Sequence, residues 1–259
     1  MLMPAKVWLA TYCHDPEDTL ASRAAVSAEL LTKLFYGIVV RFTDGTDGCV
    51  SRSMDGAVRL TGSVREPLGL VRKRVTTEAY EAGADCVVLC DFDRALHWSS
   101  GFIDELVLEL ARLPSGDITV YGRSRRVMRT HPPMQRLTEG AINDLFSVAA
   151  GYAWDVTAGA RAFSRLGIER IVMASDEMTR GVDCVWPLRA IMDGGLSFEY
   201  REVEGLEYED NPARTFGASV SCALGEDGEG VDRQSARRLF YAKQEAEAIC
   251  RLLGVRRSS

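Results

Sequence analysis

The stretch Cys86-Val87-Val88-Leu89-Cys90-Asp91-Phe92-Asp93-Arg94 decides the fold expected for this chain. Its first five residues are apolar and rich in β-branched side chains, which is typical of a strand buried inside a sheet. Two carboxylates follow, so negative charge lies at the carboxyl end of that strand. Because ligands bind at the carboxyl ends of strands in an open α/β sheet, the stretch predicts a ligand site at this edge.

Asp91 and Asp93 are the first candidate site residues. In a continuing strand, alternation places both on one side and Phe92 on the other. Two neighbouring carboxylates repel each other unless a proton or cation lies between them, and Mg²⁺ or Mn²⁺ takes oxygen ligands of this kind, especially when shared with a phosphate. We therefore expect a divalent cation here. The structural alternative is that Asp91 caps the next element while Asp93 pairs with Arg94.

The composition excludes several classes of protein. The 259 residues carry a net charge of −6, whereas a general nucleic-acid binder is basic. The seven cysteines show neither a C-x-x-C pair nor zinc spacing, so we expect reduced thiols and a cytoplasmic setting. No stretch approaches the roughly 20 apolar residues of a membrane span. The start of the chain does not read as a signal peptide.

Strand and helix patterns alternate along the chain, which favours a mostly parallel sheet with right-handed crossovers. Residues 122–136 are expected to form an arginine-bearing loop, and residues 204–230 a loop or lid. No linker rich in Pro, Gly or Ser divides residues 1–259, so we expect one domain. Strands are expected at 6–12, 38–42, 57–61, 86–90, 117–121 and 196–203, and a strand with a turn at 154–163. Helices are expected at 17–35, 67–82, 102–113, 137–150, 166–173, 183–192 and 231–254.

Six short motifs follow one another in an order typical of one enzyme family. They are Ala10-Thr11-Tyr12-Cys13-His14, Phe42-Thr43-Asp44-Gly45-Thr46-Asp47, Arg72 in its helix, Asp91-Phe92-Asp93, Thr157-Ala158-Gly159-Ala160, and Val182-Asp183 followed by Leu188-Arg189-Ala190. Over about residues 6–205, this layout resembles that of GT-A-fold, nucleotide-sugar-dependent glycosyltransferases, closest in style to family 2. The chain departs from the family pattern at His14, Thr43 and Val182, which fits a divergent branch.

The resemblance implies an α/β, GT-A-like fold with a mostly parallel central sheet flanked by helices. It also implies a metal-dependent enzyme that moves a sugar from a UDP- or GDP-sugar to an acceptor that the sequence does not identify. Residues 1–121 would form the nucleotide-binding half, 122–230 the acceptor half and 231–259 a C-terminal helix. A homo-oligomer stays open. The nucleotide-sugar-binding residues would be Thr11, Tyr12, Asp44, Arg72, Asp91, Phe92, Asp93 and Gly159, with Asp91 and Asp93 also holding Mg²⁺ or Mn²⁺.

Three of these side chains suit the chemistry of a nucleotide. Tyr12 can stack on a base, Asp44 can accept a hydrogen bond from a ring N–H or a ribose hydroxyl, and Arg72 can clamp phosphate. Each has a structural alternative, since Asp44-Gly45 is also an ordinary turn and Arg72 could lie on a solvated helix face. The arginines at 123, 125, 126 and 129 could clamp a phosphorylated acceptor or the donor diphosphate, or simply lie in a solvated loop.

Asp183 is the candidate catalytic residue. An inverting transfer needs a base that deprotonates the acceptor hydroxyl, and Asp183 begins an apolar helix. The alternative is a helix N-cap. Two other functions stay open: a sugar-phosphate nucleotidyltransferase, disfavoured because Ala10–Glu17 lacks glycine, and a non-catalytic GT-A-like binding module, which the departures at His14, Thr43 and Val182 keep in view.

Overall fold

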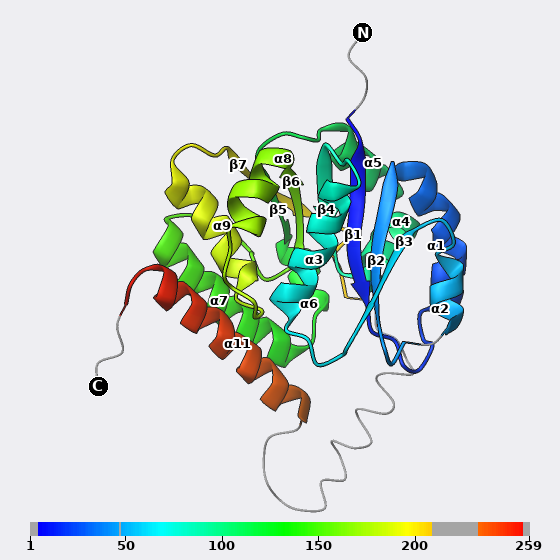
Figure 1. Ribbon diagram of the computed structural model, residues 1–259. Coiled ribbons are helices and arrows are strands. Elements are labelled where there is room, and N and C mark those ends of the chain that lie inside the picture. Colours follow the sequence, from blue (N-terminus) through cyan, green and yellow to red (C-terminus); the bar gives the residue numbers. More distant parts are fainter. Residues whose placement is uncertain (1–4, 47, 209–232, 256–259) are drawn as a thin grey trace, which may run out of the picture.

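The computed structural model describes residues 5–46, 48–208 and 233–255. One seven-stranded sheet crosses it in the order β3-β2-β1-β4-β6-β5-β7 (Figure 1). Among the described strands, β6 alone runs against its neighbours β4 and β5; the other pairs are parallel. The expected mostly parallel sheet is therefore confirmed. The strands are β1 Val7–Cys13, β2 Gly37–Thr43, β3 Val58–Gly62, β4 Cys86–Leu89, β5 Ile118–Arg123, β6 Ala160–Ser164 and β7 Phe198–Val203.

Helices cover both faces of this sheet (Figure 1). Two apolar cores result, because successive side chains of each strand point to opposite faces. Leu9 and Val88 belong to one core, and Trp8 and Val87 to the other. The described helices are α1 Ala21–Leu34, α2 Gly48–Ser53, α3 Leu68–Glu81, α4 Phe92–Gly101, α5 Ile103–Ala111, α6 Arg125–Thr130, α7 Pro133–Ala150, α8 Arg165–Gly167, the π-helix η1 Ile168–Met173, α9 Val182–Asp193 and α11 Arg233–Leu252.

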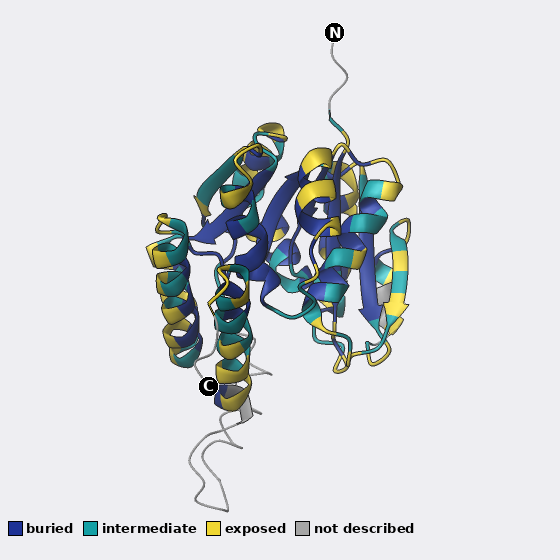
Figure 2. Ribbon diagram, turned by 60° about the vertical axis from the view of Figure 1, so that its left-hand side comes forward, coloured by how far each residue is buried: buried dark blue, intermediate teal, exposed yellow. Residues whose placement is uncertain are grey.

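Burial follows the layers of the fold. The central strands are buried along most of their length, while the outer faces of the helices are exposed (Figure 2). Strands buried on both faces read as the nearly continuous apolar runs from which the sheet was expected. None of the described helices has an apolar stretch long enough to cross a bilayer.

The prediction of an arginine-bearing loop at 122–136 is wrong, because most of this segment is helical. Ser124 caps α6 by accepting a hydrogen bond from the Val127 amide at 3.2 Å, and Pro133 begins α7. Ser is a favoured N-cap, and proline fits the first helical position because the amide it lacks has no intrahelical partner there. The two prolines at 132 and 133 therefore open a helix. Of the expected loop or lid at 204–230, residues 209–230 lie outside the described part of the chain.

One further element differs from expectation. Helix α4 begins at Phe92, where the sequence predicts no helix before residue 102. The strand and turn expected at 154–163 are present, because Gly159 turns the chain with a φ of +78° and β6 then runs from Ala160 to Ser164. Both features lie beside the candidate site.

Candidate functional site

Arg72 is the centre of the candidate site. Its side chain is completely buried on α3, at the point where the carboxyl end of β4 meets the start of α9. One amino group, Nη2, donates to Asp91 Oδ1 at 2.9 Å, and Nη1 donates to Asp183 Oδ1. Burial opposes the positive charge, but Asp183 and Asp91 together raise the pKa of Arg72 well above its usual value. The guanidinium thus stays charged and joins two distant parts of the chain.

Tyr12 lies against this ion pair from the end of β1. The guanidinium carbon of Arg72 is 5.8 Å from the centre of the Tyr12 ring. Burial and the charge of Asp91 raise the pKa of Tyr12. The phenol therefore stays protonated, and its ring lies against the Arg72 guanidinium.

Gly159 closes the site from the turn before β6. A side-chain Cβ at this position would lie 2.8 Å from Arg72 Nη2 and 3.3 Å from Asp91 Oδ1. The backbone also has the left-handed φ of +78° that glycine adopts without strain. The structure thus brings together five of the residues named from the sequence: Tyr12, Arg72, Asp91, Gly159 and Asp183.

Asp91 and Asp93 do not lie on one side of a strand, and this expectation is wrong. Asp91 is the N-cap residue of α4 and Asp93 lies in the first turn, so strand alternation does not set the direction of Asp93. Carboxylates are favourable at a helix N-terminus. Asp93 Oδ2 lies 3.8 Å from Arg94 Nη2, as the structural alternative anticipated. Asp91 makes no side-chain cap hydrogen bond and instead accepts from Arg72.

The other predicted binding residues lie elsewhere. Thr11 is 0% and Phe92 1% exposed, and Phe92 belongs to the apolar core. Both side chains are buried in this structure, and their role in binding stays a prediction. Asp44 is exposed in the turn after β2, where Oδ1 accepts from the Val64 amide at 3.0 Å. That hydrogen bond ties the turn to the segment after β3.

Asp91 and Asp93 are accessible enough to contact a cation that is shared with a phosphate. Their side chains are 27% and 34% exposed, so both carboxylates reach the surface. Within residues 5–46, 48–208 and 233–255, no cluster of three or more His, Cys, Asp or Glu could hold a metal ion. Mg²⁺ usually takes one or two protein carboxylates and completes its shell with water and phosphate oxygens. The donor set therefore suits a cation that arrives with a diphosphate, and not one held by the protein alone.

Asp183 does not have the environment of a general base. It is 0% exposed, and Oδ1 lies 2.8 Å from Arg161 Nη2 in addition to its contact with Arg72. Burial opposes its charge, but Arg72, Arg161 and Arg180 hold its pKa far below the usual value. In this structure the carboxylate is out of contact with solvent and bonded to arginines, which disfavours the removal of a proton from a substrate. Asp183 is not the N-cap of α9 either, since that residue is Gly181.

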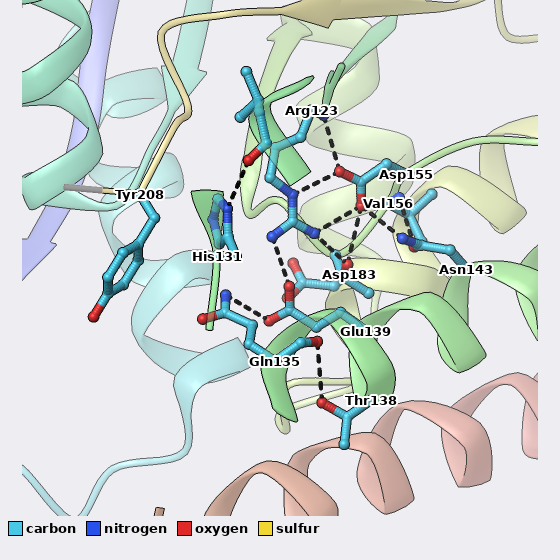
Figure 3. Close-up of polar contacts among 12 residues, drawn as sticks. Arg123, His131, Gln135, Thr138, Glu139, Asn143, Asp155, Val156, Asp183 and Tyr208 are labelled. Atoms are coloured by element: carbon cyan, nitrogen blue, oxygen red, sulfur yellow. Dashed lines mark hydrogen bonds and ion pairs between the residues drawn. The ribbon is translucent and has the colours of Figure 1, made fainter. Parts of the chain in front are cut away.

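Arg123 forms a second buried ion cluster (Figure 3). From the end of β5, its Nε and Nη2 donate to the two oxygens of Asp155 at 2.7 and 2.9 Å, and its Nη1 donates to Glu139 at 2.7 Å. Burial opposes the charge on Asp155, but Arg123 lowers its pKa to about 2. Arg123 is thus held inside the protein, and the expected phosphate clamp at this residue is contradicted.

Sequence reasoning missed Arg161, Arg180 and Glu245 as parts of the site. Arg161 is a charged residue inside the buried strand β6, and a buried charge needs a partner of opposite sign, so its position in the strand was a signal. Arg180 and Glu245 belong to segments far apart in the sequence, and their 3.1 Å contact exists only in the fold.

No protein-family model and no curated protein matches the chain, but solved structures do. Glucosyl-3-phosphoglycerate synthase from Mycobacterium tuberculosis, in complex with Mn²⁺, UDP and glucosyl-3-phosphoglycerate, is 16% identical, with a TM-score of 0.62 over 98% of this chain and 82% of that one. Its complex with Mn²⁺, UDP-glucose and phosphoglyceric acid matches with a TM-score of 0.58 at the same identity and coverage. A structure described as a mycobacterial protein is 16% identical, with a TM-score of 0.62 over 98% and 76% of the two chains. The likeness shows that this chain has the GT-A-like fold, as expected.

Proposed function

We propose that the protein is a metal-dependent glycosyltransferase that moves a sugar from a nucleoside-diphosphate sugar to an acceptor. The observation that carries this proposal is the Arg72–Asp91 pair at the end of β4, with Tyr12 beside it at the end of β1. A guanidinium, a carboxylate and an aromatic ring thus lie together at the carboxyl ends of the strands, where ligands of open α/β folds bind. Uridine diphosphate is the first donor nucleotide to test, because the similar structures contain UDP or UDP-glucose.

Asp91 and Asp93 would hold Mg²⁺ or Mn²⁺ together with the donor diphosphate. The cation would neutralise the negative charge that builds on the leaving phosphate when the bond to the sugar breaks. Arg72 would add a second, permanent positive charge beside the diphosphate, and its hydrogen bond orients the Asp91 carboxylate. Phosphoglyceric acid, found in two similar structures, is the first acceptor to test.

We assign Asp183 to positioning Arg72 and Arg161 and not to catalysis. Its complete burial and its three arginine neighbours support this role. An inverting transfer would then need a base other than Asp183. A retaining transfer would need no such base. Proton NMR of the anomeric centre of the product measures which course is followed.

Thermal-shift measurements with UDP, GDP and CMP, each with and without Mn²⁺, test the proposal. A ligand that binds only the folded state raises the melting temperature, so we expect stabilisation by UDP or GDP that depends on Mn²⁺. Asp93→Asn should remove the Mn²⁺-dependent part of that shift. Asp104→Asn is the matched control, because Asp104 lies exposed in the first turn of the neighbouring helix α5.

The two alternative functions predict other outcomes. A preference for a nucleoside triphosphate with a sugar phosphate would indicate a nucleotidyltransferase. The absence of a shift with every nucleotide would indicate a non-catalytic protein with this fold. An unchanged Mn²⁺-dependent shift in Asp93→Asn would show that the metal ligands are assigned to the wrong residues.

A further inference from the structure

The C-terminal helix α11 contacts the Arg72 site through one arginine. Arg180 lies just before α9, and its Nε is 3.1 Å from Glu245 Oε1 of α11 and 3.8 Å from Asp183 Oδ2. The Arg180 guanidinium also lies 4.9 Å from the centre of the Tyr241 ring on the same helix. Glu139 of α7 also lies close, with its Oε1 3.5 Å from Arg180 Nη2, so three carboxylates share this guanidinium and Glu245 is the nearest of them.

The arrangement of hydrogen bonds shows which carboxylate holds Arg180. Asp183 is 0% exposed, and its Oδ2 is buried without a hydrogen-bond partner among the described residues. Its other oxygen, Oδ1, is shared by Arg72 and Arg161. Glu245, which is 1% exposed, draws Arg180 toward α11. Within the described chain, Asp183 thus forms its close ion pairs with Arg72 and Arg161 only.

We propose that Glu245 is a positioning residue for the donor diphosphate, because it holds Arg180 on α11 and so keeps Asp183 bound to Arg72. Without that hold, Arg180 turns to the unpartnered Oδ2 of Asp183. The additional positive charge weakens the attraction between Asp183 and Arg72, and Arg72 loses one of the two carboxylates that fix its direction. This inference rests on the proposed binding of a nucleoside diphosphate beside Arg72.

If Glu245 has this role, the affinity for the nucleotide should depend on whether Glu245 is protonated. Burial is the main cause that raises its pKa, to about 7; Arg180 opposes the rise, and Asp183 and Glu139 add to it. Protonation near neutral pH therefore removes the charge that holds Arg180. The ionisable groups that face Glu245 or its partner are Arg180, Asp183 and Cys184 at the start of α9, Glu139 on α7, and Arg238 and Tyr241 on α11.

Calorimetric titration of the full chain with UDP and Mn²⁺ at pH 6 and pH 8 tests the proposal. We expect Glu245→Gln to bind UDP about fivefold more weakly than the native protein at pH 8, the effect of roughly one net hydrogen bond. At pH 6, where Glu245 is protonated, the two proteins should bind equally. The ionisation of UDP itself is common to both proteins and cancels in the comparison.

Two other variants separate positioning from a change in charge or folding. Glu29→Gln removes the same charge from an exposed pair on α1 and should bind UDP like the native protein at both pH values. Glu245→Asp keeps the carboxylate but shortens it, so it should bind UDP with intermediate affinity at pH 8 and keep the dependence on pH. Melting temperatures show whether each variant is folded, and Glu245→Gln should not lower stability at pH 8 because it removes a buried charge.

The outcomes distinguish the two proposals. If Glu245→Gln binds UDP as the native protein does at pH 8, the inference is wrong while the proposed function stands. If the native protein binds neither UDP nor GDP in the presence of Mn²⁺, both are wrong.

Discussion

Arg72 Nη2 of α3 lies 2.9 Å from Asp91 Oδ1, which follows the end of β4. The contact explains why Asp91, an N-cap residue, does not use its side chain to cap α4. Its carboxylate is drawn to the guanidinium, while its partial exposure leaves room for a cation. The Asp91 carboxylate thus forms an ion pair with Arg72 and is still accessible to a ligand.

Asp91 and Asp93 should differ in what they contribute to stability. Asp91→Asn weakens a charge-assisted hydrogen bond to a buried arginine, which costs about 1–3 kcal/mol of the free energy of unfolding. Asp93→Asn changes a partly exposed side chain and should stay within about 0.5 kcal/mol. Urea unfolding without nucleotide measures both. Equal losses would contradict the placement of Asp91 against Arg72.

Gly159→Ala should cost more than Gly151→Ala. The two glycines have nearly the same left-handed φ, +78° and +76°, so alanine brings a similar backbone strain of about 1 kcal/mol to each. At Gly151 the new Cβ meets nothing within 4 Å, whereas at Gly159 it lies 2.8 Å from Arg72 Nη2. We expect an additional loss of about 1–3 kcal/mol at Gly159 and weaker binding of UDP with Mn²⁺. Equal unfolding free energies of the two variants would contradict the close approach.

Arg123→Met should be strongly destabilising, whereas Arg126→Met should not. Arg123 neutralises two buried carboxylates, Asp155 and Glu139, and removal of such a partner costs about 3–5 kcal/mol. Arg126 is 54% exposed and pairs with Glu204 and Glu207 near the surface, where ion pairs contribute about 0–1 kcal/mol. Chemical denaturation of both variants at pH 7.5 measures the contrast, and a small loss for Arg123→Met would show that Asp155 and Glu139 find other partners.

His131 should make the protein less stable in acid. Burial, together with the charges of Arg123 and Arg94, lowers its pKa to about 3, while an unfolded histidine has a pKa of about 6.5. Between these values the unfolded chain binds the extra proton, so this contribution to stability is complete above pH 6.5 and falls as the pH is lowered. The unfolding free energy of His131→Asn should therefore depend less on pH between 6.5 and 4. Parallel curves for the two proteins would contradict this prediction.

The sheet was predictable because its central strands are short and apolar on both faces. Cys86–Leu89 is an example in which burial, length and the following aspartates all indicated one element. The start of α4 was not predictable in the same way. Asp-Phe-Asp is compatible with a strand end or a helix start, and the fold selects the helix by pairing Asp91 with Arg72.

Five residues of the candidate site could be named from the sequence, but the contacts among them could not. Arg72 and Asp183 are 111 residues apart, and no local pattern indicates that they meet. The departures from the family pattern show the same limit: His14 and Thr43 looked independent in the sequence, yet His14 Nδ1 lies 2.8 Å from Thr43 Oγ1. The two departures join the ends of β1 and β2.

The reversed strand β6 has a consequence for how the chain assembles during synthesis. β5 is made before β6 but lies outside it in the sheet, and residues 124–159 separate the two strands. A nascent chain that ends after residue 123 therefore has β4 and β5 but not the strand that must lie between them. The edge of β4 stays open until β6 leaves the ribosome, and the turn at Gly159 then arrives beside Asp91 together with the strand that closes the gap.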